Sequence, residues 1–195
     1  MHPKEEKTIV LIKPDGVKRG LIGEITKRFE DRGLKIIALK MVCIKRRQAD
    51  YHYPKDKTFL TVVGEKTLQD HKNYNQDVKK VFSTDNPLTI GKKLRVWMLD
   101  FLTSGPVVAM VIQGIHAVPM VRKIVGNTLP SQAEMGTIRG DFSVDSAILG
   151  NMQKRAIHNL VHASGNQKEA EHELKLWFTP EEIYSYKRSD EDIMF

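Results

Sequence analysis

Two short apolar runs constrain the fold of this chain more than any other feature of its sequence. Residues 7–13 are rich in β-branched side chains, and Pro14-Asp15-Gly16 ends the run with turn-forming chemistry. Residues 107–112 are apolar throughout and follow Gly105-Pro106. Apolar runs of this length, bounded by turn residues, predict strands that are buried in the interior of a sheet.

Outside these two runs the apolar spacing is mostly helical. A further strand is expected over 34–44, and residues 159–162 fit the end of another. Helices are predicted over 21–32, 67–82, 94–102, 120–125 and 167–178. The glycines and proline of 126–141 predict a loop, while 143–157 allow no assignment. A capping box over Ser164-Gly-Asn-Gln167 is expected to begin the last helix.

The composition is that of one globular domain. The chain has 195 residues, of which 41% are hydrophobic and 28% charged, enough for one core and short for two. No linker separates two cores, so we expect a single domain over 1–195. The lone cysteine, Cys43, excludes a disulfide framework and any zinc site with two thiolates. The charged N-terminus and the lack of a membrane-length apolar stretch predict a cytoplasmic protein without a membrane partner.

The charge balance predicts a polyanionic partner without identifying it. Lys plus Arg number 31 and Asp plus Glu 24, for a formal net charge of +7. This excess suits nucleic acid, an anionic membrane surface or a nucleotide. The basic residues are spread over the first half of the chain and the C-terminal tail is acidic, which disfavours a dedicated nucleic-acid arm.

Several known catalytic and phosphate-binding motifs are missing. The sequence has no Walker-type phosphate loop and no G-x-G-x-x-G fingerprint. It also lacks the H-R-D and D-F-G pair, the G-x-S-x-G elbow and the H-E-x-x-H zinc motif. These absences exclude a protein-kinase domain and argue against a serine hydrolase or a zinc protease.

Three basic residues are candidates for binding phosphate. Lys13 ends the first strand, Arg122 lies on a short predicted helix, and Arg139 is flanked by Gly136 and Gly140. Glycine on either side lets the backbone approach a ligand closely. Each side chain taken alone is better explained by solvent exposure. Together they supply the charge and the bidentate geometry that suit a triphosphate.

One histidine stands apart from the other histidines. His162 follows an apolar segment and precedes a helix N-terminus, where anionic groups are favoured. A neutral imidazole at this place is able to attack phosphorus, provided that a partner fixes its tautomer. Glu173 is that partner if the following helix folds back on His162. A packing role remains the alternative, and it is the preferred interpretation for His52 and His71.

Four segments resemble the nucleoside diphosphate kinase family. They are Thr8-Ile-Val-Leu-Ile-Lys-Pro-Asp-Gly-Val-Lys-Arg-Gly-Leu-Ile-Gly-Glu24, Ser104-Gly-Pro-Val-Val-Ala-Met110, Gly136-Thr-Ile-Arg-Gly-Asp-Phe142 and Asn159-Leu-Val-His-Ala-Ser164. The resemblance implies a ferredoxin-like α+β sandwich with a four-stranded antiparallel sheet. It also implies ping-pong transfer of the terminal phosphoryl group from a nucleoside triphosphate, typically ATP, to a nucleoside diphosphate. Mg²⁺ is expected to enter on the nucleotide phosphates, and the chain to form a homo-hexamer or homo-tetramer.

The resemblance also assigns roles to individual residues. His162 matches the phosphorylated histidine, which attacks through Nδ1, and Glu173 matches the carboxylate that orients its ring. Lys13 matches the lysine that contacts the transferred group. The remaining implied nucleotide contacts are Tyr53, Leu94, Arg122, Thr128, Arg139 and Asn159, with Ser164 in a supporting role. These assignments agree with the chemistry of phosphoryl transfer, which depends on positioning and charge neutralisation.

The sequence departs from the family pattern in several places. Extra residues are expected near 55–93 and within 143–157, close to where the base of the nucleotide is bound. Leu94 falls where the family has an aromatic that stacks on the base. Gly165 stands at a position that is usually Asp, and Met135 replaces a usual proline. The base preference is therefore not predicted.

Two other functions are compatible with the sequence. The first is an RNA-binding module, which requires aromatic residues on exposed strands. Residues 7–13 and 107–112 contain none, which counts against it. The second is a catalytically weakened homologue whose 55–93 insertion serves as an interaction surface.

Overall fold

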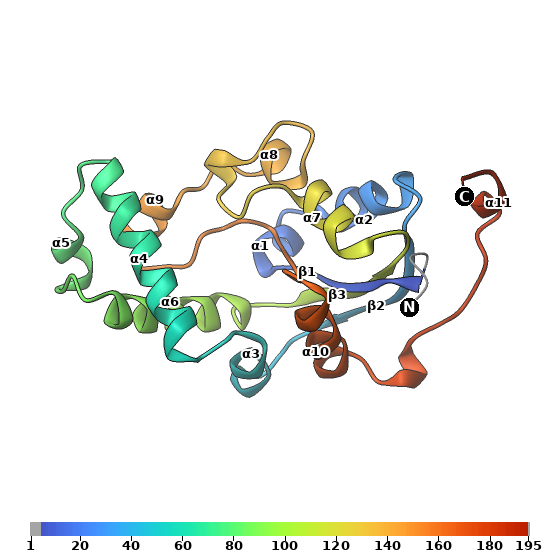
Figure 1. Cartoon of the computed structure of the whole chain (residues 1–195), viewed down its shortest axis with the longest axis horizontal. Helices are drawn as coiled ribbons and strands as arrows, with labels where there is room; N and C mark the ends of the chain where they lie inside the picture. The colour runs from blue at the N-terminus through green and yellow to red at the C-terminus, as the bar shows by residue number, and fades with distance from the viewer. Residues whose placement is uncertain (1–4, 195) are drawn as a thin grey trace.

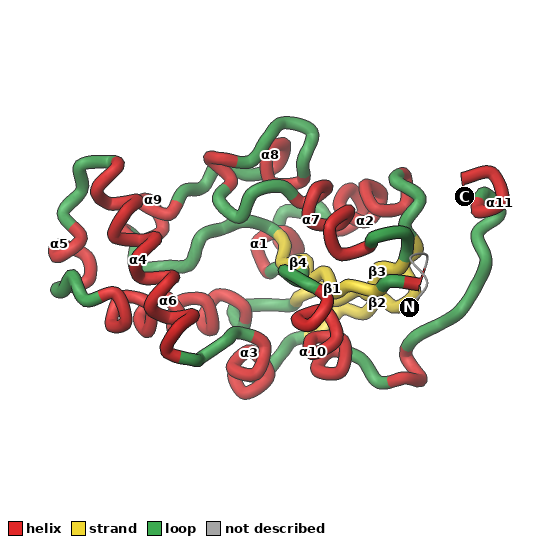
Figure 2. Tube along the Cα trace, in the orientation of Figure 1, coloured by secondary structure: helices red, strands yellow, loops and turns green. Residues whose placement is uncertain are grey.

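The computed structural model describes residues 5–194 and is built around one four-stranded antiparallel sheet (Figures 1 and 2). Its strands are β1 (Lys7–Ile12), β2 (Lys35–Val42), β3 (Val107–Gln113) and β4 (Val161–Ala163). Their order across the sheet is β2-β3-β1-β4, so β1 and β3 are the inner strands. The predicted strands and the predicted antiparallel sheet are confirmed. The single-domain prediction stays a prediction, and its residues 1–4 and 195 lie outside the described part of the chain.

The two inner strands separate two hydrophobic layers. Ile9 and Leu11 face one buried cluster, whereas Val10 and Ile12 face the other. Side chains of a strand alternate between the faces of a sheet, so a strand covered on both faces must be apolar at every position. This explains the continuous apolar run that predicted β1.

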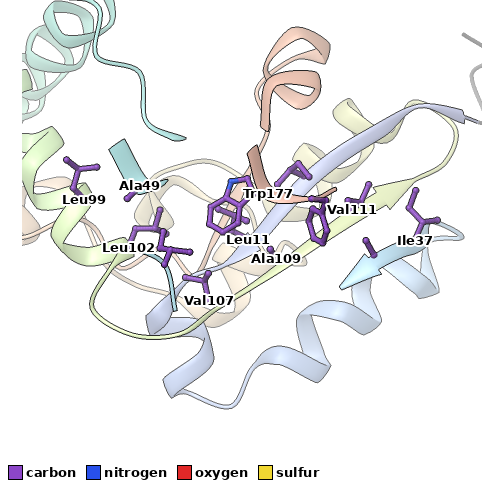
Figure 3. Packing of buried hydrophobic residues seen from close by; sticks show 13 residues of the cluster. Leu11, Ile37, Ala49, Leu99, Leu102, Val107, Ala109, Val111 and Trp177 are labelled. Carbon is purple, nitrogen blue, oxygen red and sulfur yellow. The ribbon is translucent and has the colours of Figure 1, made fainter. Parts of the chain in front are cut away.

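Helices cover both faces of the sheet and extend beyond it at one end (Figure 1). They are α1 (Pro14–Lys18), α2 (Ile22–Asp31), α3 (Arg46–His52), α4 (Lys57–Asn73), α5 (Val78–Phe82), α6 (Pro87–Leu102), α7 (Ala117–Val125), α8 (Ile138–Phe142), α9 (Ala147–Met152), α10 (Gln167–Trp177) and α11 (Glu191–Met194). Short 3-10 turns cover Pro130–Gln132 and Pro180–Glu182. Side chains from α3, α6 and α10 pack around Leu11, and Trp177 lies at the centre of this cluster (Figure 3). Side chains from α2, α7 and α8 fill the opposite layer.

Two helix predictions and one loop prediction need correction. The helix expected over 67–82 is two helices, because the chain turns after Tyr74 and the side chain of Asp77 caps α5 by accepting from Lys79 N–H. The helix expected from residue 94 begins at Pro87, capped by Asn86. The loop expected up to residue 141 ends in α8, whose first turn is capped by the side chain of Thr137.

The predicted capping box at the last helix is wrong. The side chain of Asn166, not Ser164, accepts from Glu169 N–H and caps α10. The Ser164 hydroxyl is fully buried and donates to Glu173 instead. Both residues are favoured at N-caps, and tertiary contact decided between them.

The two expected insertions pack together into one unit, which we call the insertion lobe: α4, α5, α9 and the N-terminal half of α6. A Cβ added at Gly64 of α4 would lie 1.9 Å from Pro87 O, and one added at Gly91 of α6 would lie 1.9 Å from Leu60 O. The two helices therefore cross with their backbones in contact. The buried His71 of α4 lies 3.4 Å from the buried Asn151 of α9, side-chain nitrogen to side-chain nitrogen.

The C-terminal segment lies along the start of the edge strand β2. Tyr184 N–H donates to Ile37 O at 2.8 Å, and the hydroxyl of Tyr186 donates to Ile36 O at 3.2 Å. The guanidinium of Arg188 donates to Glu30 O and Leu34 O. Among the helices of residues 5–194, none combines the length and the apolar character needed to cross a membrane.

The helix crossing in the insertion lobe leads to the first prediction. Gly64→Ala places a methyl group against the backbone of Pro87, and we expect it to lower the free energy of unfolding by about 1–3 kcal/mol. Gly23→Ala in α2 is the matched control, because a Cβ there meets nothing within 4 Å. The control is expected to be stabilising by about 0.5–1 kcal/mol. Urea unfolding followed by circular dichroism measures both changes, and equal stability of the two variants would contradict the crossing.

Candidate active site

The pairing of β4 with β1 places His162 next to the central strand. Leu11 is the Cα partner of His162 in this antiparallel pair, so both side chains lie on the sheet face that α3 and α10 cover. Lys13 directly follows β1, and its backbone N–H donates to Leu160 O at 2.7 Å. The candidate nucleophile and the candidate phosphate-binding lysine are therefore held by the same hydrogen-bonded strand pair.

Leu160 holds an unusual backbone conformation just before β4. Its φ is +68°, in the left-handed backbone region that residues other than glycine rarely adopt. Its carbonyl accepts from Lys13 N–H and its own N–H donates to Asp15 Oδ2 at 3.0 Å. Its side chain is fully buried in the core. These contacts fix the strained residue, and strain of this kind concentrates at functional sites.

Glu173 contacts the imidazole of His162. Glu173 Oε1 lies 2.7 Å from His162 Nε2, and Oε2 accepts from the Ser164 hydroxyl at 2.7 Å. A carboxylate only accepts, so Nε2 carries the proton and donates it to Glu173. The other nitrogen, Nδ1, is left with its lone pair free. This tautomer is the one that a nucleophilic Nδ1 requires.

His52 belongs to the same cluster, although its sequence context suggested only packing. It is buried on α3, and its Nδ1 lies 3.3 Å from Glu173 Oε1 and 3.3 Å from the indole Nε1 of Trp177. The two imidazole rings of His52 and His162 meet edge to face, with centroids 4.4 Å apart. The only feature of the sequence that could have placed His52 in this cluster was its position beside Tyr53.

Asn159 links the basic residues of the site. Its side-chain oxygen accepts from Lys13 Nζ at 2.7 Å, and its amide nitrogen donates to Thr128 O at 2.9 Å. The guanidinium of Arg139 donates to three carbonyls, those of Asn159, Gly126 and Val161. Lys13, Arg139 and Asn159 are all buried. The predicted phosphate-binding residues are thus gathered around the chain segment that leads to His162.

The remaining predicted residues lie around this centre. Tyr53 follows α3 and is half-buried, and its carbonyl accepts from Arg95, which anchors α6 to this segment. Arg122 is exposed on α7, and Thr128 is exposed in the loop that follows. Leu94 is half-buried on α6, and its contact with a base stays a prediction.

Gly165 has a structural explanation. Its N–H donates to the Glu169 carboxylate at 2.9 Å, and a Cβ at this position would lie 2.6 Å from Glu169 Oε2. The same Cβ would lie 3.9 Å from the guanidinium of Arg122. Glu169 therefore occupies the space that a side chain at position 165 would fill.

Burial sets the charge of the two central basic groups. Burial, and next the charge of Arg139, lowers the pKa of Lys13 to about 7, although Asp15 opposes this shift. Burial and the charge of Arg122 lower the pKa of Arg139 to about 10. Arg139 therefore stays protonated at neutral pH, whereas Lys13 is close to its midpoint.

Burial also keeps His162 neutral. Burial, followed by the charge of Lys13, lowers the pKa of the His162 imidazole below its ordinary value. Burial raises the pKa of Glu173, although His52 and the hydrogen bond from Ser164 oppose this. Burial likewise raises the pKa of Tyr53, so its hydroxyl keeps its proton. The imidazole of His162 is therefore neutral at neutral pH.

Potential metal ligands gather only at this cluster within the part of the chain that the structure describes. One nitrogen of His52, one of His162 and one oxygen of Glu173 lie within 4.8 Å of one another. The 2.7 Å between His162 Nε2 and Glu173 Oε1 is a hydrogen-bond distance. Two ligands of one tetrahedral zinc ion stand about 3.3 Å apart with bonds near 2.0 Å. The cluster is therefore arranged as a proton-holding network and not as a metal cage.

The fold is a four-stranded α+β sandwich, and its site holds a histidine beside buried cations. This combination is typical of a phosphotransferase. Sequence comparison then gives the family. The model of the family described as "Nucleoside diphosphate kinase" matches residues 6–65 and 89–183. The chain belongs to the nucleoside diphosphate kinase family. Its reaction is transfer of the terminal phosphoryl group from a nucleoside triphosphate to a nucleoside diphosphate.

Similar proteins cover nearly the whole chain. A nucleoside diphosphate kinase of Pyrobaculum aerophilum is 44% identical over 178 residues, which cover 91% of this chain and 97% of the relative. One from Pyrococcus furiosus is 41% identical and covers 93% of this chain and 88% of the relative. These coverages show that relatives exist with almost the same length.

Two solved structures share the fold. The crystal structure of an NDP kinase from Pyrobaculum aerophilum superposes with a TM-score of 0.90 at 42% identity, covering 93% of this chain and 100% of the other. A nucleoside-diphosphate kinase from Borrelia burgdorferi, described as a transition state mimic with bound vanadate and ADP, gives 0.76 at 34% identity. It covers 96% of this chain and 95% of the other. The predicted ferredoxin-like sandwich is confirmed.

The family match is interrupted inside the first expected insertion. Between its first and last matched residues it leaves out residues 66–88, which lie within the expected 55–93. These residues form the C-terminal half of α4, all of α5 and the first residues of α6. The second expected insertion, within 143–157, lies inside the matched range.

The lowered pKa of Lys13 predicts how stability depends on pH. Between pH 7 and about pH 10.5, an unfolded chain holds a proton on Lys13 that the folded chain has released. Stability therefore rises with pH in this window, by at most about 1.4 kcal/mol per pH unit from this group. Lys13→Met removes the contribution. Urea unfolding of both proteins from pH 6.5 to 9.5 measures the difference, and parallel pH curves would contradict the shift.

Proposed function

We propose that His162 carries the phosphoryl group between the two nucleotides of the kinase reaction. The observation that supports this most is the contact of Glu173 with Nε2, which leaves Nδ1 as the free nitrogen of a neutral ring. The cations Lys13, Arg122 and Arg139 are placed to neutralise the phosphates. Phosphoryl transfer needs little else from a protein than such positioning and charge.

In the first half-reaction Nδ1 attacks the γ-phosphorus of the nucleoside triphosphate. The Nδ1–P bond forms while the bond from phosphorus to the β,γ-bridging oxygen breaks, and the nucleoside diphosphate leaves with that electron pair. The ring keeps its proton on Nε2, where Glu173 balances the positive charge that develops. In the second half-reaction the terminal oxygen of another nucleoside diphosphate attacks the phosphohistidine, and the neutral ring is restored. A bound vanadate and ADP in the Borrelia burgdorferi kinase fit a transfer of this type.

We infer that the divalent ion used by this family is Mg²⁺ held by the nucleotide. Hard cations bind several oxygen ligands, and the described residues gather no group of carboxylates beside the basic residues. The ion would reach the site on the phosphate oxygens and neutralise part of their charge. The remaining negative charge of the triphosphate is then neutralised by Lys13, Arg122 and Arg139.

Three further properties belong to the same proposal. Nucleoside triphosphates and diphosphates are the partners, the chain assembles into a homo-hexamer or homo-tetramer, and it works in the cytoplasm. The alternative of an RNA-binding sheet is disfavoured because β1 and β3 are buried on both faces. The alternative of a catalytically weakened homologue is disfavoured by the contact of Glu173 with His162 and by the contacts that hold Lys13 and Arg139 at Asn159.

The direct test of the proposal is labelling of His162. Wild-type protein incubated with γ-labelled ATP should take up an acid-labile, alkali-stable label and pass it to GDP. His162→Ala should take up none. His172→Ala is the matched control, because His172 is an exposed histidine on the same helix as Glu173. Labelling of His162→Ala at the wild-type rate would refute the role of His162.

The role of Glu173 is tested by Glu173→Gln. The amide keeps the shape of the side chain but cannot balance the charge that develops on the imidazole. We expect the rate of phosphorylation at saturating ATP to fall roughly 100-fold, with a smaller change in nucleotide affinity. Single-turnover labelling and a binding titration separate the two quantities. A pure loss of affinity would show that Glu173 acts on binding and not on the imidazole.

A further inference from the structure

Asp145 closes the base of the second insertion. This buried carboxylate uses both oxygens: Oδ1 accepts from Ser146 N–H at 2.9 Å and from Arg155 at 3.1 Å. Oδ2 accepts from Arg155 at 2.5 Å and from the backbone N–H of His158 at 2.7 Å. The insertion thus leaves and rejoins the rest of the chain at one carboxylate.

A second side chain holds the same stretch of backbone. The hydroxyl of Ser143 donates to His158 O at 2.7 Å. The N–H of His158 is therefore bound by Asp145 and its carbonyl by Ser143, and both come from the strand-like segment that follows α8. We call these two contacts the His158 clamp. A charged acceptor makes the contact at the N–H the stronger of the two.

The clamp acts on the residue that organises the phosphate-binding groups. Asn159 follows His158 directly, and its amide side chain bridges Lys13 Nζ and Thr128 O. Its carbonyl accepts from Arg139 Nε at 3.1 Å. A shift of the His158 backbone would carry Asn159 with it and loosen both buried cations.

The clamp also joins the insertion lobe to the site. The short helix α9 lies between Asp145 and Arg155 and contacts α4 through Asn151 and His71. Burial would by itself raise the pKa of Asp145, but the hydrogen bonds from Arg155, His158 N–H and Ser146 N–H outweigh it and hold the pKa below its ordinary value. The carboxylate is therefore charged, and the clamp is closed, throughout the neutral pH range.

We propose that Asp145 is a positioning residue for the kinase reaction, which sets the place of Asn159 and through it that of Lys13 and Arg139. The inference rests on the proposed role of His162, because the quantity it affects is the rate of phosphorylation of that histidine. Asp145 touches neither the imidazole nor the groups that bind the phosphates. It acts through the backbone of His158.

The test is a double-mutant cycle on the full chain, read by single-turnover phosphorylation with γ-labelled ATP. Asp145→Ala alone should slow phosphorylation about tenfold at saturating ATP, as expected for the loss of a charge-assisted hydrogen bond. Asn159→Ala alone should also slow it. If Asp145 acts through Asn159, adding Asp145→Ala to Asn159→Ala should change the rate less than twofold. If the rate effects of the two single substitutions multiply in the double variant, Asp145 has only a general structural role.

A milder pair of variants keeps the proposal testable if Asp145→Ala does not fold. Ser143→Ala removes one half of the clamp and leaves the Asp145–Arg155 ion pair intact, and about a threefold slower phosphorylation is expected. Ser146→Ala is the matched control, because its hydroxyl caps α9 without touching His158. The control should lower the melting temperature without changing the rate. Equal rates for wild type and Ser143→Ala, or an equal loss in Ser146→Ala, would overturn the clamp.

This experiment separates its own failure from a failure of the proposed function. Labelling of wild type that is lost in His162→Ala establishes the reaction site independently of Asp145. If that label is present and Asp145→Ala phosphorylates at the wild-type rate, only the positioning role is refuted. If His162→Ala is still labelled, the proposed nucleophile is refuted first.

Discussion

The hydrogen bonds between β1 and β4 determine most of what surrounds the imidazole of His162. β4 has only three residues, and its pairing sets His162 opposite Leu11 on the face that α10 covers. The same face holds Trp177, whose burial draws α10 against the sheet and brings Glu173 to the imidazole. Lys13 continues directly from β1. The apolar packing that stabilises the sheet therefore also sets the positions of His162, Glu173 and Lys13.

The parts that the sequence predicted well are those with strong local signals. β1 and β3 are continuous apolar runs because they are covered on both faces, and turn residues mark where they end. The sequence pairs His162 with Glu173 because Glu173 lies on the helix that directly follows the strand of His162. His52 was missed because its contact with Glu173 arises from packing between α3 and α10, which are far apart in the sequence. The sequence predicts Ser164 as a helix cap because no neighbouring residue distinguishes it from Asn166.

The insertions illustrate a second limit of sequence reasoning. One interpretation of the sequence makes the 55–93 insertion an interaction surface. The described contacts show that the two insertions pack on each other through α4, α6 and α9. The close crossing at Gly64 and Gly91 depends on residues 27 positions apart. No apolar periodicity in the sequence predicts a contact of this kind. The sequence allows no secondary-structure assignment for residues 143–157. Their conformation is held by individual polar contacts of Asp145, and such contacts leave no repeating apolar pattern in the sequence.

The central place of β1 has a consequence for how the enzyme loses activity. Amides of a strand that is paired on both edges and buried on both faces exchange with solvent only when the whole protein unfolds. Lys13 follows this strand directly and His162 pairs with it from the edge strand β4, while the insertion lobe and the C-terminal segment lie at the periphery of the molecule (Figure 1). Local opening at the periphery leaves β1 intact, and loss of β1 itself requires global unfolding.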